Sequence, residues 1–138
     1  MNVIINIDGG SRGNPGPAGA GVVIRAADDG TVLQQAGVFL GTATNNVAEY
    51  RGLIEGLRRA EALGATQVDV VSDSELLVRQ MLGQYRVKNE GLKPLHEEAN
   101  SLAGRFEKFS IRHVRREQNT LADEMANKAM NLKRTVEE

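Results

Sequence analysis

Short hydrophobic runs separated by turn residues occupy the first forty positions of the chain. They predict strands at residues 3–8, 20–26 and 31–40. Asp28-Asp29-Gly30 is suited to a hairpin turn between the second and third strands, and the Gly- and Pro-rich segment 9–21 predicts a turn or loop over at least part of its length. Three successive strands with short connections indicate an antiparallel meander.

The hydrophobic pattern changes to helical spacing after residue 46. Apolar residues recur every three or four positions from Val47 to Leu63, which predicts a helix over 46–63 that ends before Gly64. The remaining pattern predicts a strand at 67–72, helices at 74–82 and 93–106, a strand at 108–115 and a helix at 119–132.

This order of elements, β-β-β-α-β-α-α-β-α, predicts an α/β fold with a mixed sheet. The fourth strand is expected to be parallel because a helix precedes it. We expect residues 1–132 to form one domain and residues 133–138 to be a polar, frayed C-terminal tail.

Composition narrows the class of protein only in part. A chain of 138 residues that is 41% hydrophobic and 25% charged is suited to one globular domain. The absence of cysteine excludes disulfides, thiolate metal sites and a cysteine nucleophile. Together with the lack of a signal-peptide pattern or an apolar run of about 20 residues, it predicts a cytoplasmic protein that does not span a membrane.

Charge alone does not indicate a nucleic-acid binder. The net charge is −1, from 17 basic and 18 acidic residues, whereas nucleic-acid-binding domains often carry a strong positive excess. Basic residues gather within 86–93 and 105–116. Taken by themselves, both stretches are typical of a solvated surface.

Four carboxylates stand at the ends of predicted elements. Asp8 and Asp73 end strands, while Glu49 and Asp123 fall near the starts of helices. Ligand sites in open α/β sheets lie at the carboxyl ends of strands. Each acid also has an ordinary explanation as a turn residue, a helix cap or a favourable charge at a helix N-terminus. Sequence spacing does not show whether the four meet, so both interpretations stay open at this point.

The residues around these acids carry a family resemblance. The strings are Asp8-Gly9-Gly10-Ser11-Arg12-Gly13-Asn14-Pro15-Gly16-Pro17, Thr44-Asn45-Asn46-Val47-Ala48-Glu49, Ser72-Asp73-Ser74 and Asn119-Thr120-Leu121-Ala122-Asp123-Glu124. In order and in predicted element they resemble the type 1 ribonucleases H, over residues 2–132. The resemblance implies an RNase H-like fold with a five-stranded mixed sheet, three strands antiparallel and two parallel, flanked by helices.

The resemblance also implies an activity. Members of that family are endonucleases that hydrolyse the RNA strand of RNA–DNA hybrids and leave 5′-phosphate and 3′-hydroxyl ends. The matching acids Asp8, Glu49, Asp73 and Asp123 would bind two Mg²⁺ ions, which Mn²⁺ can replace, because such hard cations prefer carboxylate oxygens. Asp8 would contact both ions, Glu49 and Asp73 mainly one, and Asp123 the other. A pair of ions can hold one phosphate between them. We expect a monomer whose partner is the hybrid.

Substrate contacts follow from the same resemblance. The hybrid's minor groove would be contacted by Gly9, Gly10, Ser11, Asn14, Asn45, Glu49 and Glu75. Thr44 would hold a DNA-strand phosphate and Tyr85 would face the DNA strand. Contacts to the 2′-hydroxyl are what distinguish RNA from DNA. Alternatively, residues 13–17 are a plain turn and Tyr85 is a core or rim aromatic.

Two features of the family are missing here. Many members insert a basic helix and loop, but residues 87–89 lead directly towards the next predicted helix, so we expect weaker affinity for the substrate. Many members also carry a mobile histidine before the last acid. His113 falls within a predicted strand, too early for that role, and we interpret both His113 and His96 as structural. Arg116 or Glu117 could take over part of the histidine's role.

Other functions are compatible with parts of the pattern. One is a nuclease of the same fold with another nucleic-acid substrate, such as a transposase or Holliday-junction resolvase. The others are a nucleic-acid-binding module with a decayed site and a small-molecule phosphohydrolase. The presence of all four acids argues against decay. The first two strings argue against the other nucleases, and loops suited to a duplex would be unexplained in a phosphohydrolase.

Overall fold

A six-stranded mixed sheet forms the centre of the molecule in the computed structural model, which describes all residues 1–138. Its strands are β1 (Asn2–Ser11), β2 (Gly16–Ala26), β3 (Val32–Ala43), β4 (Gln67–Ser72), β5 (Lys108–His113) and the short β6 (Val136–Glu137), in the order β5-β4-β1-β2-β3-β6. β2 is antiparallel to β1 and β3, while β4 is parallel to β1 and β5. The predicted sheet of three antiparallel and two parallel strands is therefore confirmed.

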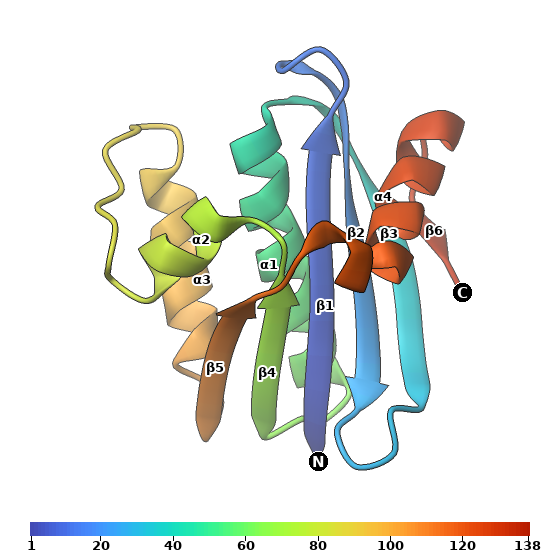
Figure 1. Cartoon of the computed structure of the whole chain (residues 1–138), viewed down its shortest axis with the longest axis vertical. Helices are drawn as coiled ribbons and strands as arrows, with labels where there is room; N and C mark the ends of the chain where they lie inside the picture. Colours follow the sequence, from blue (N-terminus) through green and yellow to red (C-terminus); the bar gives the residue numbers. More distant parts are fainter.

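Helices cover both faces of this sheet (Figure 1). They are α1 (Asn45–Ala62), α2 (Glu75–Met81), α3 (Lys93–Ala103) and α4 (Thr120–Leu132), and a short 3₁₀ helix, η1 (Arg116–Gln118), precedes α4. α1 packs on β1 and β2 from one side, with α3 against it, and α4 crosses β1, β2 and β3 on the other. No helix has the length and apolar character needed to cross a membrane.

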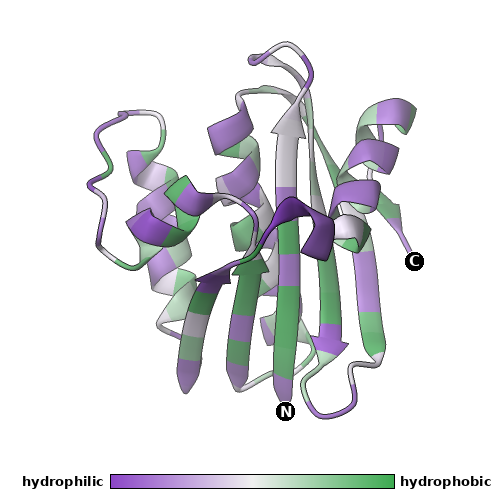
Figure 2. Ribbon diagram, in the orientation of Figure 1, coloured by the Kyte–Doolittle hydropathy of each residue, from purple (hydrophilic) through white to green (hydrophobic).

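Two hydrophobic clusters hold these layers together. The larger contains 20 buried residues and joins the sheet to α1, α2 and α3. The smaller lies between β2 and α4 and consists of Val23, Ala122 and Met125. Figure 2 shows the strands as bands of hydrophobic colour interrupted by hydrophilic positions. α4 comes very close to the sheet, because a Cβ built on Gly21 would lie 1.8 Å from the Ala122 carbonyl oxygen.

Local signals position the first two helices. The Thr44 hydroxyl accepts a hydrogen bond from the Val47 amide and caps α1, and the Ser74 hydroxyl does the same for the Leu77 amide in α2. Gly64 and Gly83 follow these helices with positive φ angles of 85° and 77°, a conformation that glycine adopts without steric cost. The predicted ends of both helices lie within one residue of those observed.

The structure differs from the predicted elements in several places. α3 ends at Ala103 rather than at residue 106, β3 continues to Ala43 rather than ending at residue 40, β5 ends at His113 rather than at residue 115, and η1 was not predicted. β1 continues through Gly9 and Gly10 to Ser11, because these residues pair with β2, so only residues 12–15 form the turn predicted within 9–21. The C-terminal tail was expected to fray, and that expectation is wrong for Val136–Glu137. This segment pairs with the edge of β3, whose backbone groups would otherwise lack partners, and the Arg59 guanidinium donates to the Glu137 carboxylate at 2.8 Å.

Candidate active site

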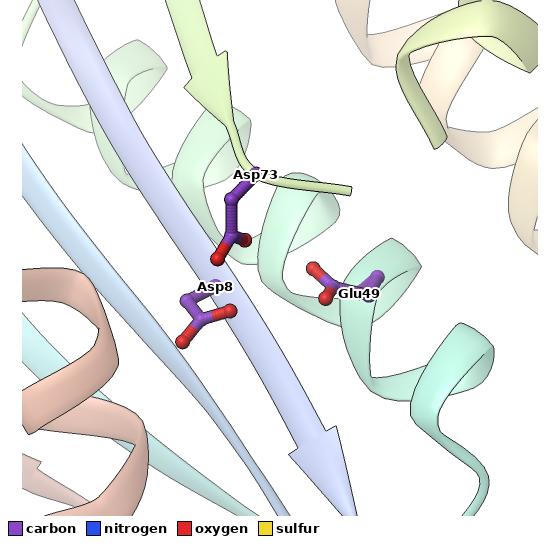
Figure 3. Close-up of side chains that lie close together, drawn as sticks. All are labelled: Asp8, Glu49 and Asp73. Carbon is purple, nitrogen blue, oxygen red and sulfur yellow. The ribbon is translucent and has the colours of Figure 1, made fainter. Parts of the chain in front are cut away.

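Three of the four predicted acids converge at one end of the sheet. One carboxylate oxygen each from Asp8, Glu49 and Asp73 lies within 4.8 Å of the other two. Figure 3 shows their side chains pointing toward one another from β1, α1 and the end of β4. Asp8 and Asp73 are neighbours because β1 and β4 are parallel and in register, with Ile7 opposite Ser72.

Asp123 approaches the same place from the other face of the sheet. It lies in the first turn of α4 and lines the same open cavity, of about 450 Å³, as the other three acids. The Arg116 guanidinium also lines this cavity, 3.8 Å from the Asp123 carboxylate. The cavity thus contains all four predicted acids and one of the two residues considered as replacements for the missing histidine.

The start of α1 reaches Asp8 because residue 9 is a glycine. A Cβ built on Gly9 would lie 2.3 Å from the Ala48 carbonyl carbon and 2.5 Å from the Glu49 amide nitrogen. Any side chain here would push the first turn of α1 away from β1. Gly9 was predicted only to contact the substrate; it also brings Glu49 to Asp8.

A buried amide network positions the start of α4. The Asn119 side chain, only 1% exposed, donates to the Ile7 carbonyl at 2.8 Å and accepts from the Asn6 side chain at 3.0 Å. The Arg25 guanidinium in turn donates to the Asn6 side-chain oxygen at 2.9 Å. Ile7 precedes Asp8, and the Asp123 backbone amide donates to the Asn119 carbonyl. This network therefore links Asp8 to Asp123. This role of Asn119 was not predicted from the sequence.

Crowding and burial disfavour the charged forms of these acids. Burial first, and then the charges of Asp73 and Asp123, raise the pKa of Asp8 from 3.8 to about 8. Burial, followed by the charges of Asp8 and Asp73, also raises the pKa of Glu49 well above its usual value. The Gly9 amide and the positive charge of Arg116 act in the opposite direction. A positive charge placed among these carboxyl groups would therefore stabilise their ionised forms.

The donor set fits a hard divalent cation. Carboxylate oxygens are the ligands that Mg²⁺ and Mn²⁺ prefer. Glu49 Oε2 is buried without any hydrogen-bond partner, and a buried polar atom of this kind ordinarily costs stability unless something satisfies it. The group of acids, with this unsatisfied oxygen, is compatible with metal binding.

Besides Glu49, four of the predicted substrate contacts line the same cavity, namely Gly9, Gly10, Ser11 and Asn45. Asn45 connects them to Asn14. The Asn45 side-chain oxygen accepts from the Ser11 backbone amide at 2.7 Å, and the Asn45 backbone amide donates to the Asn14 side-chain oxygen at 3.0 Å. Thr44 lies next to this group as the cap of α1. The segment 13–17, considered as a plain turn, is thus joined to the start of α1.

Glu75 and Tyr85 lie elsewhere. Glu75 pairs with Arg79 at 2.8 Å and lines a separate cavity beside Arg112 and His113. Tyr85 is 47% exposed, so it is not a core aromatic, and the Arg79 guanidinium lies 5.2 Å from the centre of its ring. These two predicted contacts lie in or just after α2, and neither lines the cavity that contains the four acids.

The two departures from the family pattern are visible in the structure. No helix lies between α2 and α3, so the basic protrusion is absent. His113 belongs to β5, as predicted, but it is the last residue of that strand, is exposed and lines the separate cavity beside α2. His96 packs edge-on against Tyr50 with ring centres 6.2 Å apart and lies 3.3 Å from the Gln80 carbonyl oxygen, which agrees with a structural role.

Comparison with known proteins identifies the class of this domain. A family model described as "Reverse transcriptase-like" matches residues 6–129. Bifunctional protein Rv2228c of Mycobacterium tuberculosis is 52% identical over 130 residues, which cover 94% of this chain and 36% of that protein. Ribonuclease HI of Halobacterium salinarum is 39% identical over 123 residues, 89% of this chain and 61% of that protein. The chain therefore spans about a third to three-fifths of the length of these curated relatives.

Solved structures agree with this class. The N-terminal RNase H domain of Rv2228c superimposes with a TM-score of 0.91 at 52% identity, over 94% of this chain and 99% of that one. LC11-RNase H1, solved in complex with an RNA/DNA hybrid, superimposes with a TM-score of 0.90 at 41% identity, over 95% of this chain and 98% of that one. The fold and the acidic site define an RNase H-like domain. Within that class, the chain belongs to the type 1 ribonuclease H family.

Proposed function

We propose that this chain is an endonuclease that hydrolyses the RNA strand of RNA–DNA hybrids and leaves 5′-phosphate and 3′-hydroxyl ends. The observation that carries the proposal is the convergence of Asp8, Glu49 and Asp73, with Asp123 on the wall of the same open cavity. The likeness to LC11-RNase H1, which was solved with a hybrid bound, supports this choice of substrate.

The four acids would hold two Mg²⁺ ions, which Mn²⁺ can replace. Asp8 would contact both ions, Glu49 and Asp73 mainly one, and Asp123 the other. When bound, such ions activate water as a nucleophile and neutralise the charge that develops on the phosphate. The buried, unpartnered Glu49 Oε2 and the raised pKa of Asp8 support this assignment.

The residues beside the acids would orient the hybrid. Gly9, Gly10 and Ser11 present backbone and a small side chain to the cavity, and the Asn14–Asn45 pair lies at the start of α1. We assign the minor-groove contacts to these residues and a DNA-strand phosphate to Thr44. Glu75 and Tyr85 would contact the duplex further away, along α2.

We place this activity in a monomeric nuclease unit formed by residues 1–132. Val136 and Glu137, within residues 133–138, complete the edge of its sheet by pairing with β3 as β6. The pairing of this segment with β3 is compatible with a single chain acting alone.

A panel of substrates tests the proposed function. An RNA–DNA hybrid, double-stranded RNA and double-stranded DNA of one sequence are incubated with Mg²⁺, Mn²⁺ or a chelator. We expect cleavage of the RNA in the hybrid only, and only with a metal ion present. Equal cutting of double-stranded DNA would favour a nuclease with another substrate, and binding of the hybrid without cutting would favour a nucleic-acid-binding module.

A further inference from the structure

A cationic end of the cavity lies where the turn between β1 and β2 meets α4. Arg12 comes from this turn and Asn127 from α4, and both line the cavity that contains Asp8 and Asp123. Arg12 Nη2 donates to Asn127 Oδ1 at 3.3 Å. The predicted substrate contacts include neither residue.

Asn127 positions the Arg12 guanidinium. It follows Asp123 by four residues, so the two side chains lie on one face of α4, about one helical turn of 5.4 Å apart. The Asn127 side-chain amide donates to the Asp123 carbonyl at 3.0 Å, which leaves its oxygen for Arg12. On the other side, the Arg12 amide donates to the Pro17 carbonyl at 2.9 Å and closes the turn.

The charge of Arg12 is not neutralised by any carboxylate. None of the ion pairs in the molecule includes Arg12, whereas Arg116, the other arginine in the cavity, lies 3.8 Å from Asp123. The only side-chain partner of Arg12 is a neutral amide oxygen. Arg12 lines a cavity whose expected ligand is a polyanion, and a guanidinium fork matches the geometry of a phosphate.

We propose that Arg12, positioned by Asn127, binds a phosphate of the RNA strand next to the phosphate that is cut. This inference rests on the proposed function, since it assumes that a strand lies in the cavity. Asn127, which positions Arg12, follows Asp123 by about one helical turn, so Arg12 is placed for a neighbouring phosphate rather than for the one held at the acids. It would supply part of the affinity that the basic protrusion provides in other members of the family.

The test measures binding separately from cutting. In an Asp73→Asn background, which keeps the hybrid intact, the affinity for a fluorescent hybrid is measured against salt concentration without divalent ions. We expect Arg12→Gln to weaken binding about tenfold and to reduce the slope of log affinity against log salt by about one. Asn127→Ala should weaken binding less and leave the slope unchanged, because the charge remains.

Arg105→Gln is the matched control. Arg105 is exposed and pairs with Glu61. It precedes β5, and the first residue of β5 lies opposite the first residue of β4. Arg105 is therefore at the far end of the sheet from Asp73, which follows the last residue of β4. Its variant should bind like the parent. If Arg12→Gln has the affinity and slope of Arg105→Gln, the inference is overturned while the proposed function stands. If the wild-type protein also fails to cut the hybrid in Mg²⁺, the proposed function is overturned and the inference with it.

Discussion

Replacing Asp8 by asparagine is expected to reduce hybrid cleavage by about a thousandfold or more. Asp8 is the acid at the centre of the group, within 4.8 Å of ligand atoms from Glu49 and Asp73 and close enough to Asp123 for that carboxyl to raise its pKa. An amide has a similar shape but carries no charge, so it would hold a divalent cation much less well. The measurement is the initial rate of cleavage of a labelled hybrid with saturating Mg²⁺.

The same variant should be more stable than the wild-type protein when metal is removed. The pKa of Asp8 is 3.8 in its unperturbed state and about 8 in the folded protein. Between these values the folded state binds a proton that the unfolded state does not, so the stability of the metal-free wild type falls as pH rises through this range. The Asp8→Asn variant lacks this dependence. With chelator present, its advantage in melting temperature should grow from about pH 5 to about pH 8, reaching about 5 °C.

Asp28→Asn is a suitable control for both measurements. Asp28 is an exposed residue of the hairpin between β2 and β3, far from the acids in the fold, and an asparagine retains the oxygen that accepts from the Asp29 amide. Its variant should cleave and melt like the wild type. An Asp8→Asn protein that keeps more than about a tenth of normal activity would remove Asp8 from the catalytic site.

Gly9→Ala is expected to destabilise the protein by about 3 kcal/mol and to disrupt the site. The added Cβ would lie 2.3 Å from the backbone of Ala48, so the first turn of α1 must move and carry Glu49 away from Asp8. Gly10→Ala is the matched control. A Cβ there would have Met130 Cε, 3.8 Å away, as its nearest neighbour, so its free energy of unfolding should stay within about 1 kcal/mol of the wild type.

Urea unfolding of the two glycine variants provides the measurement, and the response of the melting temperature to Mg²⁺ reports on the site. Gly9→Ala should lose most of the stabilisation by Mg²⁺ that Gly10→Ala keeps, because Glu49 no longer lies beside Asp8. Equal free energies of unfolding for the two variants would show that the close contact between β1 and α1 is not required.

The order of elements could be predicted from local pattern. The strand at 67–72 has the predicted bounds, and α1 differs by one residue at each end, because Thr44 and Gly64 mark where it begins and ends. The extension of β1 through Gly9 and Gly10 was missed because glycines are usually turn residues. Their conformation here is set by pairing with β2. β6 was missed for a similar reason, since its polar residues are ordered by the distant edge of β3.

The acids could be found from sequence only because recognisable strings surround them. Their convergence depends on contacts between distant segments, above all between Gly9 and Ala48, and no local pattern contains that information. Asn119 and Asn127 were missed for the same reason. Their spacing of four residues on either side of Asp123 was visible in the sequence, but their partners Ile7 and Arg12 lie more than a hundred residues away.

The chemical nature of the cleaved ends tests the central claim most directly. A hybrid with 5′-labelled RNA is incubated with the wild-type protein in Mg²⁺ and in chelator, and the 3′ ends of the labelled fragments are analysed. Hydrolysis at a metal site formed by the four acids predicts fragments that end in a 3′ hydroxyl in Mg²⁺ and no fragments in chelator. Fragments that end in a 2′,3′-cyclic phosphate, or equal cutting in chelator, would contradict it.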